Sequence, residues 1–224
     1  MCKLFKGLTI VRDRFYQDIV DEISRTVQEG NVLDVGTGRG LLPIKIAQRN
    51  VGLNVYGIDI SRKAIDAARR DAFSAGLTKV PRFEVGDVGN LSFADDFFDL
   101  VVSTFSLHHW PDMASGLNEV YRVLKPNGSA WIYDHWKDPS QEAREGLRKD
   151  FGLLAACFAL AHLRFISSSL TRENARIILD DSTLKFQKRR VEERGIFLLL
   201  KLQKSEASGK YKNMQKVRSG RRQE

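Results

Sequence analysis

Val32-Leu33-Asp34-Val35-Gly36-Thr37-Gly38-Arg39-Gly40 is the stretch that decides the fold. Its first four residues are a short apolar run with one acid, which predicts a buried strand. Three glycines follow at alternate positions, where they allow a sharp turn and let a ligand approach main-chain atoms. From Leu41 onward the apolar residues have helical spacing. A strand, a glycine turn and a helix in this order predict a nucleotide-binding corner.

The spacing of the glycines differs from that of the dinucleotide fingerprint. That fingerprint is Gly-x-Gly-x-x-Gly, and this chain has Leu41 where the third glycine would stand. The next predicted strand, residues 54–59, ends in Asp59, whose carboxylate can accept hydrogen bonds from both hydroxyls of a ribose. This placement suits NAD and S-adenosylmethionine equally, so Asp59 alone does not decide between them.

Length and composition indicate one α/β domain with small additions. The chain has 224 residues, of which 42% are hydrophobic, enough for a substantial core. The two cysteines, Cys2 and Cys157, cannot form a disulfide framework, so we expect reduced thiols and a cytoplasmic protein. We also expect no signal peptide and no transmembrane segment, because the apolar runs are too short.

The positive charge is concentrated at one end of the chain. Residues 185–224 hold 13 Lys+Arg against 4 Asp+Glu, whereas residues 1–184 hold 23 against 24. We therefore predict a domain over residues 1–204 and a basic, disordered tail over residues 205–224. Such a tail can attract nucleic acid by charge, but a solvated tail is the favoured interpretation.

The remaining segments continue the alternation of helices and strands. We predict strands at residues 82–87, 97–103 and 129–133, with a turn at Lys125-Pro126-Asn127-Gly128 before the last of these. Helices are predicted at residues 12–29, 61–75, 112–125 and 171–181, with Ser61 and Asp112 as caps. Two final strands, residues 184–192 and 196–204, form a hairpin, which argues against an all-parallel NAD-type sheet.

Four separated motifs agree in order and spacing with a known family. They are Asp34-x-Gly-x-Gly-x-Gly40, Phe98-Asp-Leu-Val-Val-Ser103, Leu107-His-His-Trp110 and Glu119-Val-Tyr-Arg-Val-Leu-Lys-Pro-Asn-Gly128. Over about residues 12–135 the chain resembles the ubiquinone/menaquinone-biosynthesis type of class I S-adenosylmethionine-dependent methyltransferase. The resemblance implies a Rossmann-like three-layer α/β sandwich, in which a seven-stranded, mostly parallel sheet has an antiparallel last strand.

The resemblance also implies S-adenosylmethionine as cofactor, S-adenosylhomocysteine as product, and a set of cofactor-binding positions. Asp87 would bind the adenine amino group beside the Val88 amide, although a turn Asp before Gly89-Asn90 is an alternative. Tyr16 would border the cofactor, or simply pack against the sheet. The full predicted set is Tyr16, Asp34, Gly36, Thr37, Gly38, Gly40, Asp59, Ile60, Asp87, Val88 and Ser103.

Residues 136–170 form an insertion between the fifth strand and the next helix. Their apolar stretch, residues 151–166, predicts one or two helices over the carboxyl ends of the strands. In the family that the chain resembles, such an insertion is a substrate lid, while additional core packing is the alternative.

Methyl transfer is an in-line displacement, for which a dedicated base is not obligatory. His108, His109 and His135 could each take a proton, because a histidine titrates near neutral pH, and His109 and His135 are the candidate bases. A metal site is not expected, since adjacent histidines such as His108 and His109 point apart in an extended loop.

Several substrate classes lose support. The segment Ser103-Thr104-Phe105-Ser106 lacks the Asn/Asp-Pro-Pro-aromatic motif of enzymes that methylate the amino groups of bases, and neither cysteine lies in a nucleophile motif. We therefore expect a small-molecule acceptor. An RNA or protein methyltransferase that docks through the tail, and a non-catalytic cofactor-binding module, remain open, as does a homodimer.

Overall fold

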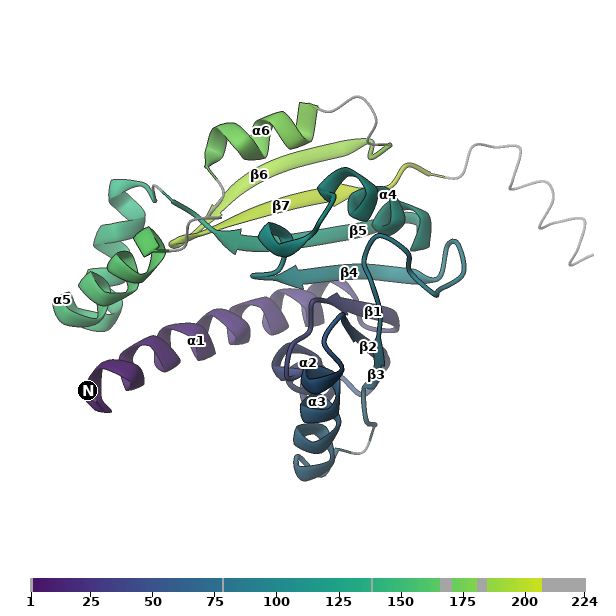
Figure 1. Ribbon diagram of the computed structural model, residues 1–224, viewed down its shortest axis with the longest axis horizontal. Coiled ribbons are helices and arrows are strands. Elements are labelled where there is room, and N and C mark those ends of the chain that lie inside the picture. Colours follow the sequence, from purple (N-terminus) through teal and green to yellow (C-terminus); the bar gives the residue numbers. More distant parts are fainter. Residues whose placement is uncertain (1, 78, 138, 166–170, 181–184, 207–224) are drawn as a thin grey trace, which may run out of the picture.

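The structure of the protein is a computed structural model that describes residues 2–77, 79–137, 139–165, 171–180 and 185–206. Helices and strands alternate along these ranges (Figure 1). In chain order they are α1 (Cys2–Thr26), β1 (Gly30–Val35), α2 (Leu41–Arg49), β2 (Leu53–Asp59), α3 (Arg62–Ser74), β3 (Arg82–Val85), β4 (Phe98–Thr104), the 3-10 turn η1 (Leu107–His109), α4 (Met113–Val123), β5 (Leu124–His135), α5 (Gln141–Phe165), α6 (Arg172–Asp180), β6 (Lys188–Arg194) and β7 (Phe197–Gln203).

One seven-stranded sheet runs through the molecule in the order β3-β2-β1-β4-β5-β7-β6. β1 to β5 pair in parallel, and β7 is antiparallel to both of its neighbours. Val35 pairs with Ile58 on one side and with Ser103 on the other, so the carboxyl ends of three strands lie level. The predicted sheet with an antiparallel last strand is confirmed, and ligands of such sheets lie at this edge.

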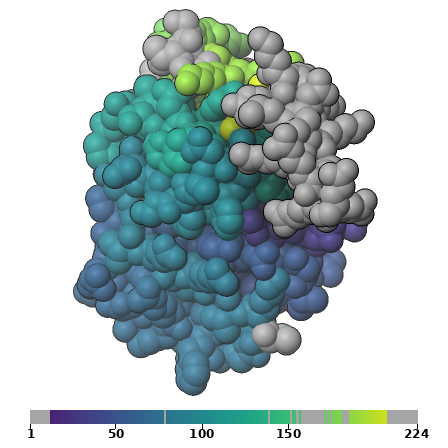
Figure 2. Space-filling model, turned by 90° about the vertical axis from the view of Figure 1, so that its right-hand side faces the viewer, coloured from purple at the N-terminus to yellow at the C-terminus, as the bar shows by residue number. Residues whose placement is uncertain are grey.

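Helices cover both faces of the sheet because neighbouring strand residues point to opposite sides. Val32 belongs to the buried cluster that includes residues of α1 and α2, whereas Leu33 and Val35 belong to the cluster on the other face, which includes residues of α4 and α6. α5 joins the same face as α1 and lies beyond the carboxyl ends of β4 and β5 (Figure 1). In the view of Figure 2, the segments up to about residue 100 and the later segments occupy separate halves of the surface.

Two predicted boundaries are wrong. The first helix begins at Cys2, ten residues before the predicted start, and its predicted apolar face (Phe15, Ile19 and Ile23) is buried. The predicted turn at residues 125–128 lies inside β5, where it bulges out between the pairs Phe98–Leu124 and Leu100–Ser129. Asn127 has a left-handed backbone there, and Pro126 has no N–H to pair, so the chain loops out without ending the strand.

The other predicted elements agree with the structure. The Ser61 hydroxyl caps α3 by accepting a hydrogen bond from the amide of Ala64, and Asp112 caps α4 in the same way. The predicted insertion is helical: α5 is two helices separated at Gly152, which has a positive φ of 80°. The described part of the chain contains no helix long and apolar enough to cross a membrane. Predictions for residues 166–170, 181–184 and 207–224 lie outside the described residues.

Candidate functional site

The turn between β1 and α2 uses its three glycines for different purposes. All three have a left-handed backbone, with φ between 55° and 76°. A Cβ on Gly36 would lie 2.4 Å from the Cβ of Ser106, and one on Gly40 would lie 2.7 Å from the Phe83 ring. A Cβ on Gly38 would meet nothing within 4 Å. Packing inside the protein therefore explains Gly36 and Gly40, while Gly38 borders open space where a ligand can approach the backbone.

Asp59 holds this turn from the end of β2. Its Oδ2 accepts a hydrogen bond from the amide of Gly38 at 2.8 Å, and its Oδ1 accepts one from the amide of Ser61 at 2.9 Å. Each carboxylate oxygen can accept a second hydrogen bond. Asp59 can therefore position the turn and still bind a ribose.

A cavity of about 520 Å³, which we call the glycine-turn cavity, opens beside Gly38. Inside it, Asp34 Oδ1 and Thr37 Oγ1 are buried and make no hydrogen bond of ordinary geometry among the described residues, although the Thr37 side chain lies near enough to the Asp34 carboxyl to favour its charged form. Leaving a buried polar group unpaired costs about 1–3 kcal/mol, so a ligand that supplies partners is favoured there. The lining residues are Arg12, Tyr16, Asp34, Gly36, Thr37, Gly38, Arg39, Leu41, Leu42, Ile44, Asp71, Thr104 and Phe105.

The protonation of Asp34 depends on what occupies this cavity. Burial raises the pKa of the Asp34 carboxyl to about 7; the Thr37 side chain opposes the rise as a hydrogen-bond donor, and the negative charge of Asp59 adds to it. A cation beside the carboxyl would lower this pKa and favour the charged form. S-adenosylmethionine carries two cationic groups, an ammonium and a sulfonium. The Asp34 carboxyl in the cavity therefore fits that cofactor. The Tyr16 hydroxyl lies 3.3 Å from Thr104 Oγ1 on the opposite wall.

The predicted adenine-binding residues lie at the ends of β2 and β3. The side chain of Ile60 is 71% exposed and offers an apolar surface. Asp87 Oδ1 accepts a hydrogen bond from the amide of Gly89 at 2.9 Å, which is the turn geometry that the sequence left open as an alternative. Val88 buries its side chain in the core. Binding of adenine by Asp87 and Val88 stays a prediction.

Ser103 faces inward, although it was predicted to bind cofactor. It is completely buried, and its hydroxyl lies 2.6 Å from that of Ser106. Ser106 Oγ donates a hydrogen bond to the Val35 carbonyl and accepts one from Trp110 Nε1. Since a hydroxyl has one proton, Ser103 must be the donor to Ser106. This network joins β1, β4 and the segment after β4, so the Ser103 side chain has a role in packing.

The histidines after β4 and β5 form a cluster around a buried acid. His108 Nδ1 lies 2.7 and 2.9 Å from the two oxygens of Asp134, which also accept hydrogen bonds from the amides of His108 and His135. The rings of His108 and His109 are 4.0 Å apart, because the segment is a 3-10 turn and not an extended loop. The His135 ring stacks on Phe105 at 4.6 Å. The described residues hold no group of His, Cys, Asp and Glu side chains suited to a metal ion.

The sequence indicated His108 as one of three histidines that could take a proton, but His109 and His135 were the predicted bases, and the pairing of His108 with Asp134 was not predicted. Burial raises the pKa of Asp134, and the neighbouring His108 partly opposes that effect. An ionised Asp134 would keep the proton of His108 on Nδ1, which leaves Nε2 as the basic nitrogen. An acid at the carboxyl end of the strand before His135 was the signal that could have indicated this pair.

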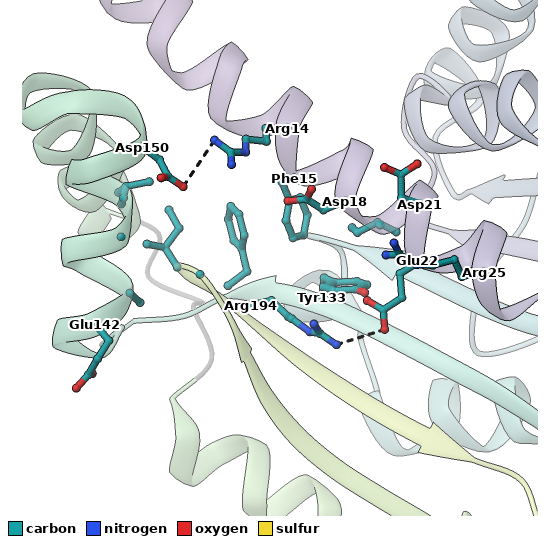
Figure 3. A pocket seen from close by; sticks show the side chains of 17 residues that line it. Arg14, Phe15, Asp18, Asp21, Glu22, Arg25, Tyr133, Glu142, Asp150 and Arg194 are labelled. Atoms are coloured by element: carbon teal, nitrogen blue, oxygen red, sulfur yellow. Dashed lines mark hydrogen bonds and ion pairs between the residues drawn. The ribbon is translucent and has the colours of Figure 1, made fainter.

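A second cavity, of about 590 Å³, lies between α1, α5 and the turn from β6 to β7 (Figure 3). We call it the α1–α5 cavity. Its inner wall is aromatic and its rim is charged. Its residues are Arg14, Phe15, Asp18, Ile19, Asp21, Glu22, Arg25, Tyr133, Glu142, Ala143, Gly146, Leu147, Asp150, Arg194, Gly195, Ile196 and Phe197.

Aromatic rings separate the two cavities. Phe15 lines the α1–α5 cavity and Phe105 lines the glycine-turn cavity, with ring centroids 5.3 Å apart. Phe197 packs against both, at 4.2 Å from Phe15 and 4.9 Å from Phe105. Phe105 is one of three non-glycine residues in the described ranges with a left-handed backbone.

The fold and the site define a class of protein: a Rossmann-like α/β domain with a cavity at its first glycine turn. Residues 33–132 match the family model described as "Methyltransferase domain". With the four ordered motifs, this match identifies that part of the chain as a class I methyltransferase domain that resembles the ubiquinone/menaquinone-biosynthesis type.

Individual relatives agree with this assignment. The chain is 29% identical over 123 residues to a ubiquinone/menaquinone biosynthesis C-methyltransferase of Geotalea daltonii, covering 54% of this chain and 52% of the relative. It is 38% identical over 104 residues to a demethylmenaquinone methyltransferase of Lactobacillus johnsonii, covering 46% and 42%. The chain thus spans about half the length of the curated relatives it matches.

A solved structure extends the similarity of fold to most of the chain. A proposed S-adenosylmethionine-dependent methyltransferase of Methanococcus maripaludis superposes with a TM-score of 0.70 and 22% identity. The superposition covers 88% of each chain. At this identity the similarity supports the fold but does not show which reaction the chain catalyses.

Proposed function

We propose that the protein binds S-adenosylmethionine in the glycine-turn cavity and transfers its methyl group to a small-molecule acceptor. The observation that carries the proposal is Gly38, a glycine of the cavity lining at which an added Cβ would meet no neighbouring atom within 4 Å. The buried Asp34 carboxyl in the same cavity supports it.

The cavity and the strand ends beside it would divide the cofactor between them. Outside the cavity lining, Asp59 would bind the ribose hydroxyls, and Ile60, Asp87 and Val88 the adenine. Asp34 would face the cationic end, beside Tyr16. When bound, S-adenosylmethionine supplies an electrophilic methyl group, whose bond to sulfur breaks as its bond to the acceptor forms.

We propose His108 as the base that takes the acceptor's proton, with Asp134 as its positioning residue. His109 and His135, the bases predicted from the sequence, lie beside it. The variants His108→Gln, His109→Gln and His135→Gln separate the three. Loss of the base should lower the rate with a protonated acceptor by about 100-fold or more, with cofactor affinity unchanged. A full rate in His108→Gln would refute this assignment.

Two matched variants test the cofactor site. Gly38→Ala and Gly76→Ala each put a Cβ on a left-handed glycine with nothing within 4 Å, and φ is 55° and 61°. The two should therefore lose similar folding stability. Only Gly38→Ala should obstruct a ligand, so we expect at least a tenfold loss of S-adenosylhomocysteine affinity by calorimetry in that variant alone.

The same titration also tests the choice of cofactor. Native protein should bind S-adenosylmethionine and S-adenosylhomocysteine, and should not bind NAD. A preference for NAD, or equal affinities in Gly38→Ala and native protein, would contradict the proposal.

We also propose that α5 is a lid over the acceptor. Its position beyond the carboxyl ends of β4 and β5 and its break at Gly152 support this role. Amides of α5 should exchange faster than those of β4 in the free protein, and should slow when product and acceptor are bound. Protection equal to that of β4 in the free protein would make α5 ordinary core.

A further inference from the structure

We propose that β6 is a dimerisation edge, at which two copies of the chain join their sheets by antiparallel pairing about Val191. The two sheets would then form one continuous sheet across the dimer. Three strands separate β6 from β1 and its glycine turn, so the dimer would form independently of the methyl transfer proposed above.

β6 is an edge of the described sheet, where it pairs with β7 and with no other strand. A two-residue turn, Gly195-Ile196, joins the two strands, and Arg194 pairs with Phe197 across it. In a hairpin with such a turn the closing pair is hydrogen-bonded, and hydrogen-bonded pairs alternate along the strands from there. Alternate residues of β6 therefore point their backbone N–H and C=O groups away from β7, toward the outer edge. These residues are Arg189, Val191 and Glu193.

The charges of β6 are complementary to themselves when the strand is reversed. Its sequence, Lys-Arg-Arg-Val-Glu-Glu-Arg, has two arginines directly before Val191 and two glutamates directly after it. In an antiparallel pair centred on Val191, Arg189 lies opposite the partner's Glu193, and Arg190 lies opposite the partner's Glu192. The symmetry of the dimer forms each of these pairs twice. Opposite charges that face each other across neighbouring strands stabilise a sheet.

The same charges disfavour other registers. Residues that point outward on one strand must face outward-pointing residues on the other, so the register can shift only by two residues at a time. A shift in one direction places Arg190 opposite the partner's Arg190, and a shift in the other places Glu192 opposite the partner's Glu192. Like charges directly opposite each other are destabilising. The register centred on Val191 is therefore favoured over its neighbours.

The side chains of β6 leave the central pairs available. Arg190 is exposed and forms no ion pair with another described residue. Glu192 lies 2.9 Å from Arg194 of its own chain, and a carboxylate can accept a further hydrogen bond from the partner's Arg190. At the ends of the strand Lys188 would face the partner's Arg194, which is a like-charge pair. Arg194 is already paired within its own chain, with Glu192 and at 3.3 Å with Glu22, which offsets that repulsion.

The helix beside β6 adds apolar surface to the same edge. α6 packs against β6 (Figure 1), and the Arg189 guanidinium donates hydrogen bonds to the carbonyls of Leu179, in α6, and Phe186. A twofold axis perpendicular to the sheet keeps both copies of α6 on one face, so the two helices would be neighbours across the axis. Ile177 of α6 is 64% exposed. Its burial against a second copy would remove apolar surface from water.

Charge reversal on either side of Val191 tests the dimer and its register. Sedimentation equilibrium of the full chain from about 1 μM to 1 mM measures the mass, and we expect dimer at the upper end. Arg190→Glu and Glu192→Arg each turn two opposite-charge pairs into like-charge pairs, because the symmetry doubles every change. Each variant alone should therefore raise the dissociation constant of the dimer at least about tenfold.

Mixing the two variants should restore the dimer. One chain then carries acids at positions 190 and 192 and the other carries arginines at both, so every central pair is again of opposite charge. This recovery also shows that both variants are folded. The matched control is Arg70→Glu, because Arg70 is exposed on α3 and its reversal changes the net charge equally. It should leave the dissociation constant unchanged.

Amide hydrogen exchange shows whether β6 is the edge that pairs. The Val191 amide should exchange at least about tenfold more slowly at the highest protein concentration than at the lowest, whereas the Arg190 amide, which faces β7, should be protected at both. A native protein that stays monomeric, a dimer that Arg190→Glu does not weaken, or variants that fail to pair when mixed would overturn the inference. Equal protection of Val191 at all concentrations would also overturn it, because the edge would then be covered within one chain.

Discussion

The two cavities are built in different ways. The glycine-turn cavity takes its central residues from a short stretch of chain, Asp34 to Ile44, and its shape depends on backbone angles. The α1–α5 cavity is formed by side chains from α1, β5, α5 and the turn between β6 and β7, which are far apart in the sequence. A cavity shaped by the backbone requires particular residues in a fixed order, whereas one shaped by side chains can change its preference through single substitutions.

The largest expected effect is a difference in unfolding free energy between substitutions in two glycine turns, one beside each cavity. Gly36→Ala combines a left-handed backbone with a Cβ 2.4 Å from Ser106, so we expect a loss of about 2–5 kcal/mol in unfolding free energy. Gly195→Ala has the same type of backbone but open space, and should lose only about 1–2 kcal/mol. Urea denaturation measures both, and equal losses would contradict the comparison.

The next effect concerns Asp34 and pH. Its folded pKa of about 7 lies above the value near 3.9 of an unfolded Asp, so between these pH values the folded state holds the extra proton. Unfolding free energy should therefore fall as pH rises from about 4 to 7, by up to about 1.4 kcal/mol per pH unit. Asp34→Asn should remove this contribution. If native and variant proteins show parallel pH profiles in urea denaturation, the carboxyl is not protonated in the free cavity.

A smaller effect is expected for Asp59→Ala. The variant loses the predicted ribose contact and the acceptor for the amides of Gly38 and Ser61, so cofactor affinity should fall by roughly 10- to 100-fold, about 1.5–3 kcal/mol. Calorimetry with S-adenosylhomocysteine measures it. Asp66→Ala is the control, because Asp66 makes only an exposed pair with Arg69 at 3.9 Å. If Asp59→Ala binds S-adenosylhomocysteine as tightly as the native protein does, Asp59 does not bind the ribose.

The smallest effect should come from a change outside both cavities. Deleting residues 205–224 removes six Lys+Arg but leaves Lys204, whose Nζ donates to Asp96 Oδ1 and to the Leu124 carbonyl, both at 2.7 Å. We expect unfolding free energy to change by less than about 0.5 kcal/mol and cofactor affinity to stay the same. A large drop in either would place the tail inside the domain. Binding to RNA that is lost with the tail and falls steeply with salt would instead favour the alternative function.

The difference between the cavities also explains what could be predicted from sequence. The glycine turn, the acid at the end of β2 and the closing hairpin are local signals, and they predicted the sheet and the cofactor site. The role of Ser106 depends on a contact between segments 60 or more residues apart along the chain. Predicting it needs the register of the sheet, which residue spacing alone does not provide. The contact of His108 with Asp134 was not predicted for the same reason.

The position of β7 has a consequence for how the protein is made. β7 lies between β5 and β6, and in the described sheet β6 pairs with no other strand. A ribosome must therefore synthesise the chain as far as Gln203 before β6 can join the sheet, long after the glycine turn is available. The cofactor half can acquire structure during translation, whereas the half that contains β6 and β7 can be completed only afterwards.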